Sequence, residues 1–299
     1  MLAPAVPGST DVATGSRPRV GPYAVAVVAT VLAVVSQYWL PEAVPATRVV
    51  YGSLVGSLAV VYGLPILAFL LLVGVEPLRP FARSMGRASW EGLRWYGLLS
   101  VVALFVSVAL VLVYEAVDPA ALDLLTRPNP VVESARADPG FWIAFSFAVG
   151  ALEETIFRGW LFGFWRGRPG VPWIVPAVGS SALFAGVHLY YGFTYGIASP
   201  IVYPDLFFLG LAFAAAVHYS GGNLIVVALL HGANDAASFL SLVSTPASLA
   251  VHWGIVGVGA LIAVVDYAGI RPFRSPGPFA GTLAPTPPPP PYGPGPPPS

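Results

Sequence analysis

Ionisable side chains interrupt otherwise apolar stretches of this chain in three places. They are Glu153, Glu154, Arg158, His188, His231 and Asp235. An ionisable group at the centre of a membrane helix costs about 2.5–3.5 kcal/mol, so each one requires a structural or chemical reason. Carboxylates and imidazoles that surround a water molecule can activate it as a nucleophile. The residue types therefore point to hydrolysis.

Helical spacing indicates which of these groups act together. Glu154 and Arg158 are four positions apart, so they share a helix face and can form an ion pair. Glu153 points about 100° away from Glu154 and has no partner on its own helix. An unpaired carboxylate in an apolar site is a candidate general base. His231 and Asp235 are also four positions apart, so we expect Asp235 to orient the imidazole and fix its tautomer.

A separate apolar segment supplies His188, which can complete a cluster around a water molecule. Glu153, His188, His231 and Asp235 would also suffice to bind one divalent metal such as zinc. A bound metal would make the water acidic near neutral pH. The residues themselves do not decide between a metal-free and a metal-assisted reaction, so the need for a metal cofactor stays open.

Small residues beside these groups are expected to allow neighbouring helices to approach closely. They are Gly150, Ala151, Gly159, Gly186, Gly232 and Ala233. By contrast, we interpret His218 and His252 as packing residues, because no carboxylate accompanies either of them in the sequence.

The segments that carry these residues are expected to cross a membrane. Of the 299 residues, 56% are apolar and only 9% are charged, whereas about a quarter of a soluble domain is charged. A net charge of zero gives no basic face for nucleic acid, and the absence of cysteine excludes disulfides and thiol catalysis. About eight segments are apolar and long enough to span a bilayer. They are 22–40, 50–75, 97–114, 141–165, 173 to the 190s, 203–219, 222–242 and 247–269.

Backbone groups in lipid must be satisfied within their own segment, so these spans are predicted to be helices. We predict an all-α polytopic membrane protein of about eight helices, with its active site inside the helix bundle. Residues 1–20 are predicted to be a disordered leader, residues 21–270 the membrane domain, and residues 271–299 a proline-rich disordered tail.

The distribution of arginine predicts the orientation, because cytoplasmic loops carry an excess of basic residues. The arginine-rich segments are the leader, loop 75–96, the loop after residue 165 and the region after residue 269. All four fall on one side of an eight-helix arrangement. We therefore expect a multi-pass protein of a bacterial plasma membrane, with the N-terminus and the C-terminus in the cytoplasm.

At the candidate residues the sequence resembles the CPBP intramembrane metalloprotease family, also called the Abi or type II CAAX prenyl endopeptidase-like family. The family pattern is two adjacent glutamates followed by an arginine, then Phe-x-x-x-His, then His-x-x-x-Asn/Asp, on separate membrane helices. The matching residues are Glu153, Glu154, Arg158, Phe184, His188, His231 and Asp235. The region that carries the motifs covers about residues 141–242.

The resemblance implies a role for each matching residue. Glu153 would activate the attacking water, Glu154 and Arg158 would brace the site, and His188 would share the water or a metal with Glu153.

His231 and Asp235 would bind a metal or stabilise the tetrahedral oxyanion. An ionised aspartate cannot donate a hydrogen bond to an oxyanion, as the asparagine of other family members can. We therefore expect Asp235 to orient His231 or to ligate a metal, and the neighbouring Asn234 to face elsewhere on the helix.

The resemblance thus implies a membrane endopeptidase that cuts a membrane-associated or lipidated peptide or protein. Family members process prenylated C-termini in eukaryotes, and bacterial relatives are linked to bacteriocin maturation or self-immunity. Two alternatives are a transporter or channel that uses the same cluster as a proton relay, and a non-catalytic scaffold that binds through its proline-rich tail. The protease predicts that Glu153→Ala abolishes function, whereas the scaffold predicts loss on deletion of the tail.

Overall fold

The computed structural model describes residues 20–75, 77–78, 88–120, 135–166, 168, 170–188, 199–220 and 222–268, without the side chains of 88–92, 199–202 and 266. Helices account for nearly all of this part of the chain, and none of it is a strand. The predicted leader, the predicted tail and most of the arginine-rich segments lie outside the described residues.

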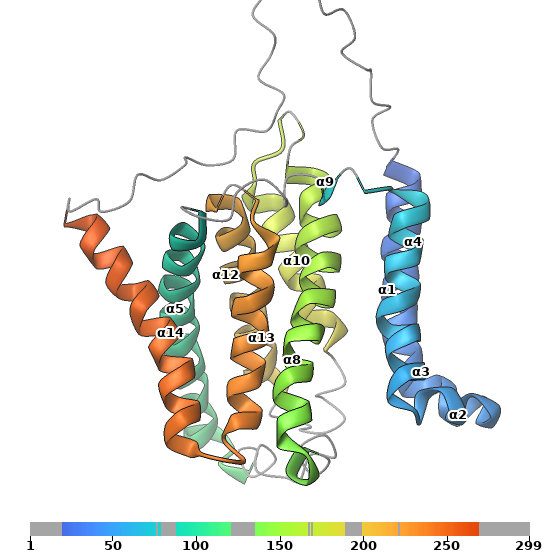
Figure 1. Cartoon of the computed structure of the whole chain (residues 1–299), viewed down its shortest axis with the longest axis horizontal. Coiled ribbons are helices and arrows are strands. Elements are labelled where there is room, and N and C mark those ends of the chain that lie inside the picture. The colour runs from blue at the N-terminus through green and yellow to red at the C-terminus, as the bar shows by residue number, and fades with distance from the viewer. Residues whose placement is uncertain are drawn as a thin grey trace, which may run out of the picture.

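The helices follow one another as roughly antiparallel rods (Figure 1). In chain order they are α1 (Val20–Ala43), α2 (Arg48–Tyr51), α3 (Leu54–Leu58), α4 (Leu64–Leu72), α5 (Ala88–Val117), α8 (Pro139–Glu154), α9 (Gly163–Arg166), α10 (Ile174–Val187), α12 (Ser199–Tyr219), α13 (Leu224–Leu240) and α14 (Thr245–Tyr267). Two π-helical segments, Ala59–Gly63 and Thr155–Phe162, join α3 to α4 and α8 to α9. Each of the eight apolar segments of the sequence therefore contains one helix or one run of consecutive helices.

Length and composition identify five of these helical runs as candidate membrane spans. They are Val20–Ala43, Leu54–Leu72, Leu93–Val117, Pro139–Arg166 and Thr245–Val265. The apolar helices Ile174–Val187 and Leu224–Leu240 are shorter, and both lie in the bundle beside the longer spans. The prediction of an all-α polytopic membrane protein is confirmed.

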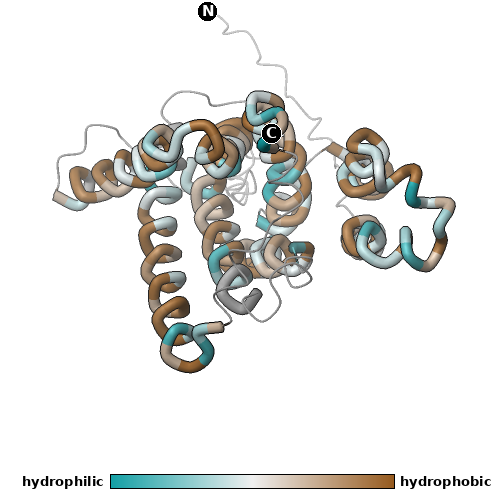
Figure 2. The backbone as a smooth tube through the Cα atoms, turned by 90° about the horizontal axis from the view of Figure 1, so that it is seen from below, coloured by the Kyte–Doolittle hydropathy of each residue, from teal (hydrophilic) through white to brown (hydrophobic). Residues whose placement is uncertain are grey.

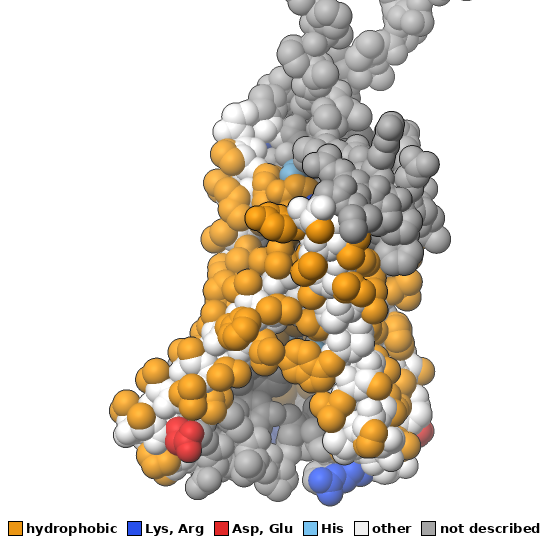
Figure 3. Space-filling view, turned by 90° about the vertical axis from the view of Figure 1, so that its left-hand side faces the viewer, with side chains coloured by type: hydrophobic (Ala, Val, Ile, Leu, Met, Phe, Trp, Pro, Cys, Tyr) orange, Lys and Arg blue, Asp and Glu red, His pale blue; other side chains and the backbone are white. Residues whose placement is uncertain are grey.

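The surface of the bundle is apolar, as contact with lipid requires. Large side chains such as Leu71, Phe105 and Leu261 are more than half exposed. Hydrophobic side chains cover most of the described surface in Figure 3, where the acidic and arginine side chains lie near its lower end. The tube in Figure 2 shows the same apolar character along the helices, with α1 and α4 to one side of the others.

Helices α8 and α13 carry most of the candidate residues, and side-chain caps fix where both helices begin. The Asp138 carboxylate accepts a hydrogen bond from the backbone N–H of Phe141 at 3.0 Å. The Asn223 side-chain oxygen accepts one from the backbone N–H of Val226 at 3.1 Å. Each cap satisfies an amide that the first turn of the helix leaves unpaired.

Glycines bring these two helices into backbone contact. A Cβ added to Gly150 would lie 2.7 Å from the backbone nitrogen of Gly232, and one added to Gly232 would lie 2.7 Å from the Cα of Phe147. This agrees with the close approach expected at these positions. Gly186 differs from the expectation, because a Cβ there would meet nothing within 4 Å. Close packing of α10 does not require this glycine.

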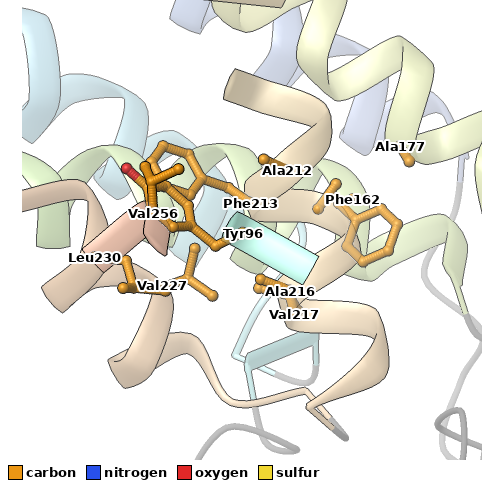
Figure 4. Packing of buried hydrophobic residues seen from close by; sticks show 11 residues of the cluster. Tyr96, Phe162, Ala177, Ala212, Phe213, Ala216, Val217, Val227, Leu230 and Val256 are labelled. Atoms are coloured by element: carbon orange, nitrogen blue, oxygen red, sulfur yellow. The ribbon is translucent and has the colours of Figure 1, made fainter. Parts of the chain in front are cut away.

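An apolar cluster next to the candidate residues joins α5, α10, α12, α13 and α14 (Figure 4). Within it the Tyr96 and Phe213 rings stack with centroids 5.6 Å apart. Both rings are at most 2% exposed, so the position of Phe213 is fixed from two sides. This matters because Phe213 contacts the imidazole of His231.

The helix pair α1 and α4 docks on the π-helical segment that follows α8. The Phe69 and Trp160 rings stack with centroids 5.3 Å apart, and the Trp160 indole donates to the Gly74 carbonyl at 2.8 Å. On α1, the Tyr23 hydroxyl donates to the Leu161 carbonyl at 3.1 Å. The N-terminal helices thus contact the segment that carries Arg158.

Candidate active site

A buried chain of three side chains links α8 to α13. Arg158 Nη1 donates to Glu154 Oε1 at 2.9 Å, so the ion pair expected from the spacing is present. The same oxygen lies 2.7 Å from His231 Nδ1. A carboxylate oxygen only accepts, so His231 carries a proton on Nδ1. Glu154 and Arg158 are 0% exposed and His231 is 3% exposed, so solvent does not compete for these bonds.

Aromatic rings and a backbone carbonyl enclose the guanidinium of Arg158. Its Nη2 donates to the Gly210 carbonyl of α12 at 3.0 Å. Its carbon lies 4.6 Å from the Phe184 ring centroid and 5.2 Å from that of Phe213, which are cation–π distances. The Phe213 ring also stacks on His231, with centroids 4.8 Å apart. These contacts leave the imidazole little freedom to turn.

Two further carboxylates face the other nitrogen of His231. Its Nε2 lies 3.6 Å from Glu153 Oε2 and 3.5 Å from Asp235 Oδ2. The Asp235 side chain keeps 31% of its surface exposed and that of Glu153 keeps 9%, whereas that of Glu154 has none. The more accessible side of the imidazole is therefore the side of Glu153 and Asp235.

The carboxylate that contacts Nδ1 of His231 is not the one expected from the sequence. The spacing favours Asp235, but Glu154 makes the 2.7 Å contact with Nδ1 because α8 packs directly on α13. Asn234 also differs from the expectation that it faces elsewhere. Its amide lies 3.4 Å from Asp235 Oδ1 as a donor, and its own oxygen accepts from the Tyr96 hydroxyl at 3.3 Å.

Glu153 contacts a tyrosine, Tyr62, that no pattern in the sequence indicates. The Tyr62 hydroxyl donates to Glu153 Oε1 at 2.7 Å from the π-helical segment before α4. This leaves Oε2 as the oxygen that faces His231. Tyr62 lies in an uncharged stretch, and only its phenolic oxygen distinguishes it from its apolar neighbours.

His188 lies immediately after α10, where it caps the helix end. Its Nδ1 lies 2.7 Å from the Phe184 carbonyl, so Nδ1 carries the proton donated to this oxygen, and Nε2 is the nitrogen left to face away from it. Its ring packs against Phe184, with centroids 4.8 Å apart, and Phe184 meets His231 edge-on at 5.8 Å. Phe184 thus links His188 to the buried cluster.

The two histidines interpreted as packing residues lie elsewhere. His218 is 7% exposed and stacks on Trp173, with ring centroids 4.6 Å apart. His252 packs edge-on against Trp253.

Four of the candidate residues are also the candidate metal ligands, namely Glu153, His188, His231 and Asp235. Within the described ranges no group of three or more His, Asp or Glu side chains is arranged to hold a metal ion. One nitrogen of His231 is occupied by Glu154, and the other lies beside two carboxylates at ion-pair distances. With no such group among the described residues, we derive no catalytic step through a metal.

Comparison with known proteins places these residues in a family. The model of the family described as type II CAAX prenyl endopeptidase Rce1-like matches residues 136–237. The matched segment contains all six candidate residues, whereas Tyr62 lies outside it. Neither the curated proteins nor the solved structures gave a match to the chain. The family is one of endopeptidases, which agrees with a carboxylate and a histidine held together among membrane helices. Residues 136–237 therefore form a domain of the type II CAAX prenyl endopeptidase Rce1-like family.

Proposed function

We propose that this protein is an intramembrane endopeptidase that hydrolyses a peptide bond of a membrane-associated or lipidated peptide or protein. The observation that carries the proposal is the pairing of Glu153 Oε2 with His231 Nε2 at 3.6 Å. The buried Glu154 holds the imidazole in place from behind. A water molecule beside Glu153 and His231 would contact a proton acceptor and a proton donor at once.

Glu153 acts as the general base in this mechanism. Its Oε2 takes one proton from the water as the water oxygen bonds to the carbonyl carbon of the scissile peptide. The carbonyl π electrons move onto oxygen and give a tetrahedral oxyanion. His231, with a proton on Nε2 as well as on Nδ1, donates a hydrogen bond from Nε2 to this oxyanion. One such donor contributes about 3–4 kcal/mol in well-studied hydrolases.

The intermediate then collapses with the protons balanced. The oxyanion electrons re-form the carbonyl, the C–N bond breaks, and Glu153 gives the proton it took from water to the leaving nitrogen. The products are a carboxylic acid and an amine, and Glu153 is ionised again. Asp235 stays an acceptor throughout and holds the Nε2 side of His231 in place.

Arg158 and Glu154 have supporting roles in the proposal. Arg158 neutralises the buried Glu154 at 2.9 Å, which allows Glu154 to keep its bond to Nδ1 of His231. Without Arg158 the buried carboxylate of Glu154 would be unpaired, and breaking such a buried pair costs about 3–5 kcal/mol. His188, through Nε2, would share the water with Glu153.

We also propose that the protein lies in a plasma membrane with both termini in the cytoplasm, as the arginine distribution predicts. A processing or self-immunity role in bacteriocin systems follows as a proposal from the resemblance alone.

A cleavage assay in proteoliposomes tests the proposed activity. The full chain is incubated with a library of membrane-inserted peptides, together with a farnesylated CAAX peptide and the same peptide without the lipid, and the products are read by mass spectrometry. Glu153→Gln removes the base, and Glu42→Gln is a matched control because Glu42 forms an exposed ion pair with Arg48 on α1 and α2. We expect cleavage by the wild type and by Glu42→Gln only. Equal cleavage by wild type and Glu153→Gln would refute the mechanism.

A further inference from the structure

The contact between Tyr62 and Glu153 joins two parts of the chain that lie 91 residues apart. Glu153 belongs to the family domain at residues 136–237, whereas Tyr62 comes from the N-terminal helices before it. The hydroxyl donates at 2.7 Å, a length typical of a strong O–H···O bond to a carboxylate. The N-terminal helices therefore supply a polar group to the site.

Packing holds the phenol ring of Tyr62 where it can reach Glu153. Tyr62 packs on a buried apolar cluster that includes Phe69, Ile156, Phe157 and Trp160. Its helix leaves the α-helical register at Ala59–Gly63 for one π-helical segment, which turns the side chains relative to an α-helix. Such segments occur frequently at functional sites.

A hydrogen bond to one carboxylate oxygen fixes the direction of the other. Without it the carboxylate of Glu153 could rotate about its last side-chain bond and exchange its two oxygens. With Oε1 bound to Tyr62, Oε2 is the oxygen that lies 3.6 Å from His231 Nε2. The hydroxyl thus decides which oxygen of Glu153 faces His231.

We infer that Tyr62 is a positioning residue of this protease, which holds Oε1 of Glu153 so that Oε2 is aimed at the water and at His231. The inference rests on the proposed function, because it assigns Glu153 the role of base. It also makes the N-terminal helices part of the working site. They dock through the Phe69–Trp160 stack and the bond from Trp160 to the Gly74 carbonyl.

Tyr62→Phe tests the inference, because it removes the hydroxyl and keeps the ring that packs on the cluster. Tyr23→Phe is the matched control. It removes a hydroxyl from the same N-terminal helices, but one that donates to the backbone carbonyl of Leu161 instead of to a candidate catalytic group. We expect Tyr62→Phe to lower kcat by about 10- to 100-fold, the size expected when one hydrogen bond to a charged group is lost. KM should stay unchanged, and Tyr23→Phe should retain the wild-type kcat.

Combining variants separates positioning from a general structural effect. In Glu153→Asp the base is kept, but the side chain is one methylene shorter and draws the carboxylate away from the Tyr62 hydroxyl. Adding Tyr62→Phe to Glu153→Asp should therefore lower its reduced kcat little further. A structural role would instead lower kcat by the same factor in the wild type and in Glu153→Asp. That second outcome would overturn the inference.

Chemical labelling of carboxyl groups with the hydrophobic reagent dicyclohexylcarbodiimide tests the contact between Tyr62 and Glu153 without any substrate. The Tyr62 hydroxyl covers Oε1, so the modification of Glu153, followed by mass spectrometry, should be faster in Tyr62→Phe than in the wild type or Tyr23→Phe. If Tyr62→Phe shows the labelling and the kcat of the wild type while Glu153→Gln is inactive, the role of Tyr62 is overturned and that of Glu153 is kept. Wild-type cleavage by Glu153→Gln would overturn the proposed function and the inference together.

Discussion

Replacing Arg158 by methionine should strongly destabilise the protein, because the change leaves a buried carboxylate without its cation. Arg158 and Glu154 are both 0% exposed, and their closest nitrogen and oxygen lie 2.9 Å apart. Methionine is unbranched and apolar like the stem of arginine, but it is shorter and carries neither the charge nor the donors. The variant also loses the bond to the Gly210 carbonyl and the cation–π contacts with the Phe184 and Phe213 rings.

The magnitude follows from the distance and the burial. At an effective dielectric constant of about 20, unit charges 2.9 Å apart attract by about 6 kcal/mol. Desolvation offsets part of this attraction, and removal of one partner of a buried pair usually costs about 3–5 kcal/mol. We expect that loss for Arg158→Met. In Arg158→Met/Glu154→Gln no orphan charge remains, so the loss should be smaller than the sum of the single losses by about 0.5–3 kcal/mol.

Unfolding in mixed micelles, with sodium dodecyl sulfate titrated into a non-ionic detergent, measures these free energies for the four proteins of the cycle. Helix content by circular dichroism follows the transition. Arg158→Met with the stability of the wild type would refute the reasoning. A double variant that loses the full sum of the single losses would refute it as well, because no coupling between the two side chains would then exist.

Three further predictions follow from the packing and from the site. Gly150→Ala should lower stability by about 1–3 kcal/mol through overpacking on the backbone of α13. Gly186→Ala, whose added Cβ meets nothing within 4 Å, should match the wild type in thermal unfolding. Equal unfolding midpoints for the two variants would contradict the close contact of α8 and α13. Trp160→Phe should cost at least about 1 kcal/mol, measured by the same unfolding, because the Gly74 carbonyl loses its indole donor and the smaller ring leaves a void at a buried site. An unchanged stability would show that this bond contributes nothing. His231→Gln should abolish peptide cleavage, because it removes the imidazole proposed as the oxyanion donor. His218→Gln, which changes a residue in an aromatic stack, should retain cleavage. Cleavage by His231→Gln would contradict the proposed role of His231.

The helical architecture could be predicted from composition because lipid permits few structures. A bilayer requires about 20 apolar residues per span and backbone bonds within the segment, and both requirements are visible along the chain. The π-helical segment Thr155–Phe162 was not predictable in this way, because its apolar composition is equally compatible with an α-helix. Tertiary contacts made by this segment, such as the Trp160 indole bond to Gly74, are likewise not visible in the sequence.

The candidate site could be predicted where its contacts are local. The Glu154–Arg158 pair follows from spacing on one helix, and the structure contains it. The partner of His231 Nδ1 does not follow from spacing, because Asp235 is in reach along the helix while Glu154 comes across from α8. Tyr62 escaped prediction for the same reason, since its contact with Glu153 depends on how the N-terminal helices dock.

A single-turnover cleavage in water enriched in ¹⁸O tests the central claim most directly. Purified wild type, Glu153→Gln and Glu42→Gln are each mixed in excess with a peptide that the wild type cleaves, and the new carboxyl terminus is weighed by mass spectrometry. Attack by a water that Glu153 activates predicts one ¹⁸O atom in the product of wild type and of Glu42→Gln, formed at equal rates, and no product from Glu153→Gln. Product formed by Glu153→Gln at the wild-type rate, or product without ¹⁸O, would contradict the account.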